Sequence, residues 1–156
     1  MIREDKQALV DELSEKFQSH NAFYITDASS MTVASRSASA AGCDAIQKKK
    51  ATGNQDHVQP GTPISYPDAP PTFGQHYSEP DPMARKFYTT GDRPELGTLV
   101  HNLEHGYTIL WYDETIADSD TKMDMLRGIA SKLQGTTNYR DKFKAVPWTS
   151  EDGEPF

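Results

Sequence analysis

The sequence has little cysteine and little apolar character. Cys43 is its single cysteine, and 35% of its 156 residues are hydrophobic, which is low for a globular domain. One cysteine excludes an intramolecular disulfide and zinc sites that need two or four thiolates. No run of about 18 apolar residues occurs, so the sequence predicts no membrane span. The N-terminus carries charges of both signs in place of an apolar signal core, which by default predicts a cytoplasmic chain.

Positive charge is also scarce. The chain has 16 basic and 23 acidic residues, for a formal net charge of −7. This balance argues against a broad basic surface, so we expect no nucleic-acid partner. The charge balance does not argue against a protein partner.

Hydrophobic patterning predicts regular structure at both ends of the chain. It indicates helices over residues 3–19, 98–105 and 119–134, and strands over residues 22–26, 107–112 and 142–146. Alternation within the strand over 107–112 places Ile109 and Trp111 on one face and Leu110 and Tyr112 on the other.

The middle of the chain predicts irregular structure. Residues 28–56 are rich in small and polar side chains, which is typical of a linker. Residues 57–97 hold most of the ten prolines, which excludes long helices and central strands there. We therefore expect an α+β fold with a small, mostly antiparallel sheet, one or two packed helices and a long proline-rich loop layer.

The segment His101-Asn-Leu-Glu-His105 carries the clearest chemical signal. Side chains at positions i and i+4 of a helix lie on one face, so the two imidazoles can share a metal ion. Neutral imidazole nitrogens suit zinc or copper. His57 and His76 lie on the preceding proline-rich segment, which can fold over this helix. The sequence therefore predicts a metal site of four histidines.

Three further residues are candidates for supporting such a site. Glu104 lies beside both helical histidines, where it could orient a ligand or become one. Tyr66 and Tyr77 lie in the same proline-rich stretch and could hydrogen-bond to the ligands or stack on them.

Two other interpretations of the histidines stay open. In the first, they are buried hydrogen-bonding groups of a structural or protein-interaction domain outside the cytoplasm. In the second, the chain is a zinc metallohydrolase, because H-x-x-E-H is also the signature of a class of zinc peptidases in which Glu104 would be the general base. Here the motif runs directly into Gly106 and a predicted strand, and the third ligand that such a peptidase needs from a later helix is not evident.

From about residue 42 to the end, the chain resembles a bacterial family of unknown function numbered 3105. The motifs that carry the resemblance are Gly42-Cys-Asp, Asp56-His-Val, Tyr66, Pro70-Pro-x-x-Gly-x-His, Phe87-Tyr and Val100-His-Asn-Leu-Glu-His-Gly. The resemblance names no activity. It implies that the four histidines recur together, and it implies a membrane-anchored domain outside the cytoplasm. It also implies further strands and a later cysteine that would pair with Cys43, so the domain is expected to be truncated.

Residues 1–34 resemble the start of a ribosomal stalk-base protein. The residues that match are Met1-Ile-Arg-Glu-Asp-Lys, Phe23-Tyr-Ile-Thr-Asp and Met31-Thr-Val-Ala. This segment carries three basic and six acidic side chains, which makes it a poor RNA-binding element by itself. We therefore expect a helix–strand appendage over 1–34, a linker over 35–56 and a histidine-containing domain over 57–156, and the junction indicates a fusion.

Overall fold

The computed structural model describes residues 23–27, 47–51 and 53–153, with the backbone alone considered for 23–27. The helix expected over 3–19, Cys43 and most of the linker lie outside the described residues. Among the described residues, no helix combines the length and the hydrophobicity that a membrane span requires.

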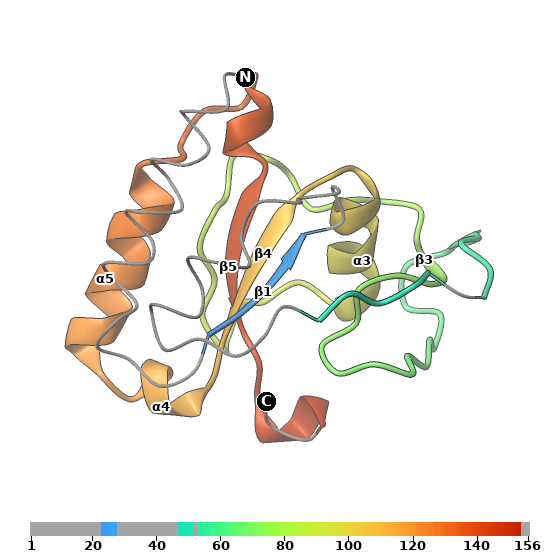
Figure 1. Cartoon of the computed structure of the whole chain (residues 1–156), viewed down its shortest axis with the longest axis horizontal. Coiled ribbons are helices and arrows are strands. Elements are labelled where there is room, and N and C mark those ends of the chain that lie inside the picture. The colour runs from blue at the N-terminus through green and yellow to red at the C-terminus, as the bar shows by residue number, and fades with distance from the viewer. Residues whose placement is uncertain (1–22, 28–46, 52, 154–156) are drawn as a thin grey trace.

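A three-stranded sheet forms the centre of the fold (Figure 1). Its middle strand is β4 (Thr108–Tyr112), which lies between β1 (Phe23–Asp27) and β5 (Phe143–Pro147). The strand β1 pairs antiparallel with β4, whereas β5 pairs parallel with it.

The α+β class is confirmed, but the expectation of a mostly antiparallel sheet is wrong. The chain leaves β4 through the short helix α4 (Glu114–Ala117) and the longer helix α5 (Asp120–Ser131), and then passes a 3₁₀ turn, η1 (Tyr139–Asp141), before β5. A helix between two neighbouring strands returns the chain to the same end of the sheet, so the second strand runs parallel to the first.

Each face of the sheet is covered by one main helix, and Figure 1 shows the sheet between α5 and α3 (Leu96–Glu104). Leu110 and Tyr112 of β4 face the apolar side of α5, including Leu126. Ile109 and Trp111 face the opposite side, where they pack with residues of α3 such as Leu103. The two faces of β4 are therefore divided as its alternating sequence predicts.

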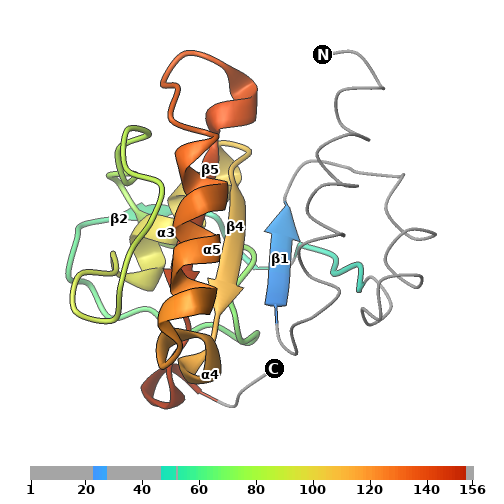
Figure 2. The same ribbon diagram turned by 90° about the vertical axis from the view of Figure 1, so that its left-hand side faces the viewer.

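The proline-rich segment forms a separate layer beside α3. It contains the parallel two-residue strands β2 (His57–Val58), labelled in Figure 2, and β3 (His76–Tyr77), labelled in Figure 1. Gly97 lets α3 approach this layer closely, because a Cβ atom at that position would lie 3.0 Å from two ring atoms of Tyr77. After β5 the described chain ends in a second 3₁₀ turn, η2 (Ser150–Asp152).

Buried polar groups join this layer to the helix and the sheet. The backbone N–H of Asp81 donates to Asn102 of α3 at 3.0 Å, and the Asn102 amide donates back to the Asp81 carbonyl at 2.9 Å. The Lys144 ammonium of β5 is fully buried and donates to the Asp81 carboxylate and to the carbonyls of Pro82 and Arg85. The loop that follows β3 is thus fixed to both α3 and β5.

Candidate functional site

Four of the five histidines gather where the proline-rich layer meets α3. His57 and His76 are register partners in the β2–β3 pair, and their ring centroids lie 4.6 Å apart. His101 of α3 lies 4.9 Å from the first ring and 5.0 Å from the second. His105, at the C-terminal end of α3, stacks on His101 with centroids 4.7 Å apart.

The donor atoms of this histidine cluster converge closely enough to hold a metal ion. One ligand atom from each of His57, His76 and His101 lies within 4.8 Å of the others. A second group with the same spacing consists of His101, Glu104 and His105. The two groups share His101, so they form one continuous set of five potential ligands.

His76 is held by contacts on both of its ring nitrogens. Its side chain is 1% exposed, its Nδ1 lies 2.8 Å from the Gly74 carbonyl oxygen, and its Nε2 lies 3.1 Å from Glu104 Oε2. A carbonyl oxygen only accepts, so Nδ1 carries hydrogen, and the neutral ring would then turn the Nε2 lone pair toward a carboxylate. A proton or a metal cation on Nε2 removes that repulsion.

His101 is oriented in the same way by a backbone carbonyl. Its Nδ1 donates to the Tyr77 carbonyl oxygen at 2.6 Å, so the neutral ring has its lone pair on Nε2, which lies 2.8 Å from His105 Nε2. Burial lowers the pKa of His101, the bond to Tyr77 opposes that shift, and the neighbouring imidazoles add to it. His101 is thus favoured in the neutral form that a metal requires.

The outer side of the cluster faces solvent. The side chain of His57 is 50% exposed and that of Glu104 is 37% exposed, and His57 Nε2 lies 3.8 Å from Glu104 Oε2. His105 is exposed, and its Nε2 lies 2.8 Å from Nε2 of His101. The cluster therefore has a buried half, in which hydrogen bonds orient the rings, and a half that is open to solvent.

The two tyrosines singled out from the sequence support the site indirectly. The Tyr66 hydroxyl donates to the Gln75 carbonyl at 2.8 Å, beside His76 in the chain. The Tyr77 hydroxyl points away to Glu95, at 2.6 Å, while its backbone carbonyl contacts His101. Sequence reasoning missed the carbonyls of Gly74 and Tyr77, because every residue type carries such a group.

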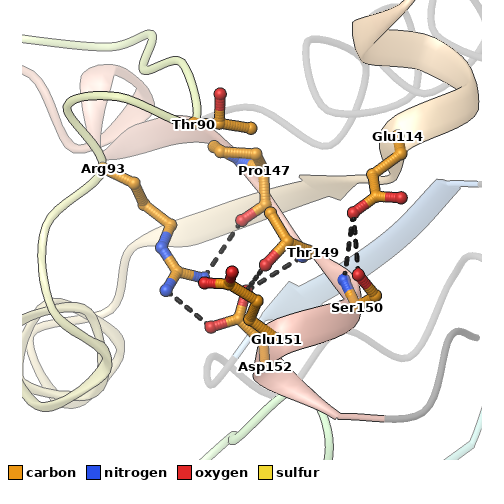
Figure 3. Close-up of a pocket in the computed structure, with 8 residues that line it drawn as sticks. All are labelled: Thr90, Arg93, Glu114, Pro147, Thr149, Ser150, Glu151 and Asp152. Carbon is orange, nitrogen blue, oxygen red and sulfur yellow. Dashed lines mark hydrogen bonds and ion pairs between the residues drawn. The ribbon is translucent and has the colours of Figure 1, made fainter.

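A polar pocket of about 340 Å³ lies elsewhere, near the end of β5 (Figure 3). Arg93 donates to both carboxylate oxygens of Asp152 at 2.6 and 2.7 Å, and Ser150 donates to Glu114. Burial alone would raise the pKa of Asp152, but hydrogen bonds from Arg93 and Thr149 lower it overall. These polar groups satisfy one another, so the pocket indicates no ligand class.

Comparisons with known proteins support both resemblances predicted from the sequence. The model of the family described as "Protein of unknown function (DUF3105)" matches residues 57–150, which include all four histidines of the cluster and Glu104. The model of ribosomal protein L10 matches residues 1–38. Searches of curated proteins and of solved structures gave no match. Because the first match covers more than half of the sequence, this chain belongs to the DUF3105 family of proteins of unknown function.

Proposed function

We propose that this chain binds a transition-metal ion through His57, His76 and His101, with Glu104 or His105 as a further ligand. The observation that carries the proposal is the convergence of three imidazole donors within 4.8 Å, two of them buried. Two of these rings are each fixed at Nδ1 by a backbone carbonyl. Such outer contacts are typical of histidines that bind metals.

The geometry favours a single ion. Because Nδ1 of His101 donates to Tyr77, the one lone pair that the neutral ring can offer to either candidate ligand group is on Nε2. One lone pair serves one cation, so the two groups describe alternative sides of the same site rather than two filled sites.

The donor set favours zinc or copper(II). Three nitrogen donors plus a carboxylate or a fourth imidazole fit tetrahedral zinc, and imidazole-rich sites also bind copper. Glu104 Oε2 lies 3.1 Å from His76 Nε2 and 3.8 Å from His57 Nε2. At these distances Glu104 could bind the ion itself or orient a histidine that does. No contact of Glu104 with the described residues favours it as a general base, so the hydrolase alternative gains no support.

The test is metal content and zinc titration of the purified chain. We expect about one equivalent of zinc or copper. His57→Ala should weaken metal binding by at least about tenfold. Loss of a residue that only contacts a ligand costs about tenfold or more in metal affinity, and loss of a ligand itself should cost more. His57 is the variant of choice because its half-exposed side chain can be truncated without opening the core. Gln59→Ala is the matched control, since it truncates another exposed side chain of the same layer.

Two results would contradict the proposal. A folded chain that takes up neither zinc nor copper would leave the histidines as hydrogen-bonding groups of a structural or interaction domain. Equal metal loss in the His57 and Gln59 variants would show that the ion binds elsewhere.

A further inference from the structure

The strand β4 is bordered on both edges. On one side it pairs with β5, and on the other it pairs with β1 over five consecutive residues, from Phe23 opposite Tyr112 to Asp27 opposite Thr108. Figures 1 and 2 both show β1 beside β4 at the outside of the sheet.

The two strands belong to different family matches. β4 and β5 lie within the DUF3105 match over residues 57–150. β1 lies within residues 1–38, which match ribosomal protein L10. The strand that completes this sheet therefore comes from outside the DUF3105 match.

The sequence of β4 is that of an inner strand. Its residues, Thr-Ile-Leu-Trp-Tyr, include no lysine, proline or acidic side chain, and the last four are buried. Exposed edge strands are usually protected against pairing by charges, prolines, bulges or a cover. β4 has no charge or proline of this kind, so its second edge depends on a covering strand.

We propose that the edge of β4 opposite β5 is a strand-accepting surface. Residues 23–27 fill it within this chain, and an extended antiparallel peptide rich in β-branched and aromatic residues can take their place. In such strand addition, main-chain hydrogen bonds supply the affinity. The inference is independent of the proposed metal site, because neither β1 nor β4 carries any of its ligands.

The test weakens β1 within the full chain and supplies a replacement. A tethered strand has an effective concentration of roughly millimolar and would outcompete a free peptide. We would make Ile25→Pro and Thr26→Pro separately. Along an antiparallel pair, the N–H group of every second residue points to the partner strand, and the N–H groups between them point away. One of the two prolines therefore removes a hydrogen bond to β4, and the other removes none and is its matched control.

The probe is a fluorescent peptide of residues 20–30, with a scrambled peptide as control, followed by fluorescence anisotropy. We expect the bond-breaking variant to bind the peptide at least about tenfold more tightly than the unaltered chain, because the tethered competitor is weakened. The other proline variant should resemble the unaltered chain. Equal peptide binding by all three chains, or binding by none, would overturn the proposal.

Hydrogen exchange on the unaltered chain tests whether residues 23–27 cover the edge of β4, even if a proline variant unfolds. Amides of β4 that point toward β1 should exchange as slowly as those that point toward β5. Fast exchange of the first group in the folded chain would overturn the proposal. These amides could instead be protected from exchange only at protein concentrations at which the chain dimerises. A second copy would then cover the edge of β4, and the proposal that the chain's own residues 23–27 cover it would be wrong.

Discussion

The helix–sheet core and the proline-rich layer are built by different forces. The core between β4, β5 and α5 is apolar and periodic, and its residues are buried by packing. The layer that carries His57 and His76 has two strands of two residues each and depends on hydrogen bonds to α3 and β5. The comparison indicates that the core determines the fold, whereas polar contacts position the clustered histidines.

The largest effect should come from breaking the polar link between the two regions. Asp81→Ala leaves the buried Lys144 ammonium without its carboxylate, and loss of one partner of a buried ion pair costs about 3–5 kcal/mol. We expect a loss of that size in the free energy of urea unfolding, together with weaker zinc binding. Asp81→Ala/Lys144→Met, which removes both charges, should recover part of the stability. A loss below about 1 kcal/mol in the single variant would contradict this account of the link.

A change within the core should affect stability and leave the site intact. Leu126→Ala removes a buried side chain from the face of α5 that packs on β4, at an expected cost of about 2–5 kcal/mol in urea unfolding. Zinc affinity measured without urea should stay the same. Thr121→Ala on the exposed side of α5 is the matched control and should change stability by less than about 0.5 kcal/mol. Weaker zinc binding in the Leu126 variant would show that the two regions are not separable.

Metal should stabilise the layer directly. At a zinc concentration 100 times the dissociation constant, the folded state should gain about 2.7 kcal/mol. The Ser78 amide, which donates to the Val58 carbonyl at 2.9 Å between β3 and β2, should then exchange about 100-fold more slowly. The effect should disappear in His57→Ala. It should also fade as the pH falls, because ligating imidazoles must be neutral. An exchange rate that does not respond to zinc would contradict the prediction.

The smallest effect concerns the pocket at the end of β5. The pKa of Asp152 is lower in the folded chain than in the unfolded chain, where it is about 3.9. The ionised carboxylate therefore adds to the free energy of unfolding above about pH 3.9, and this stabilisation is lost as the pH falls through the lower pKa of the folded chain. Asp152→Asn should cost about 1.5–3 kcal/mol at pH 7 and flatten the pH dependence of urea unfolding below pH 4. Asp124→Asn, in an exposed pair with Arg127, should cost at most about 1 kcal/mol. Parallel pH profiles for the Asp152 variant and the unaltered chain would contradict the assignment.

The same contrast explains what could be predicted from the sequence. Alternation in Ile109–Tyr112 and the helical stripe through Leu126 reveal the core, because packing imposes a period on the sequence. The spacing of His101 and His105 likewise places both on one helix face. The pairing of His57 with His76 has no such signal, since two-residue strands are too short to show a period. The strands β4 and β5 are parallel because a helix connects them. This is a rule about connections between elements, and the residue pattern of a single element does not express it.

Gly97 has a consequence for the dimensions of the proposed metal site. It stands one helical turn before His101, where α3 touches the ring of Tyr77, and Tyr77 follows His76 in the chain. A methyl group there would be 3.0 Å from that ring and 3.1 Å from Ile64, so the helix or the layer would have to move by a few tenths of an ångström. Metal–ligand distances tolerate about 0.2 Å. The bare hydrogen of one glycine thus fixes how closely α3 approaches the layer, and with it the spacing between His101 and His76.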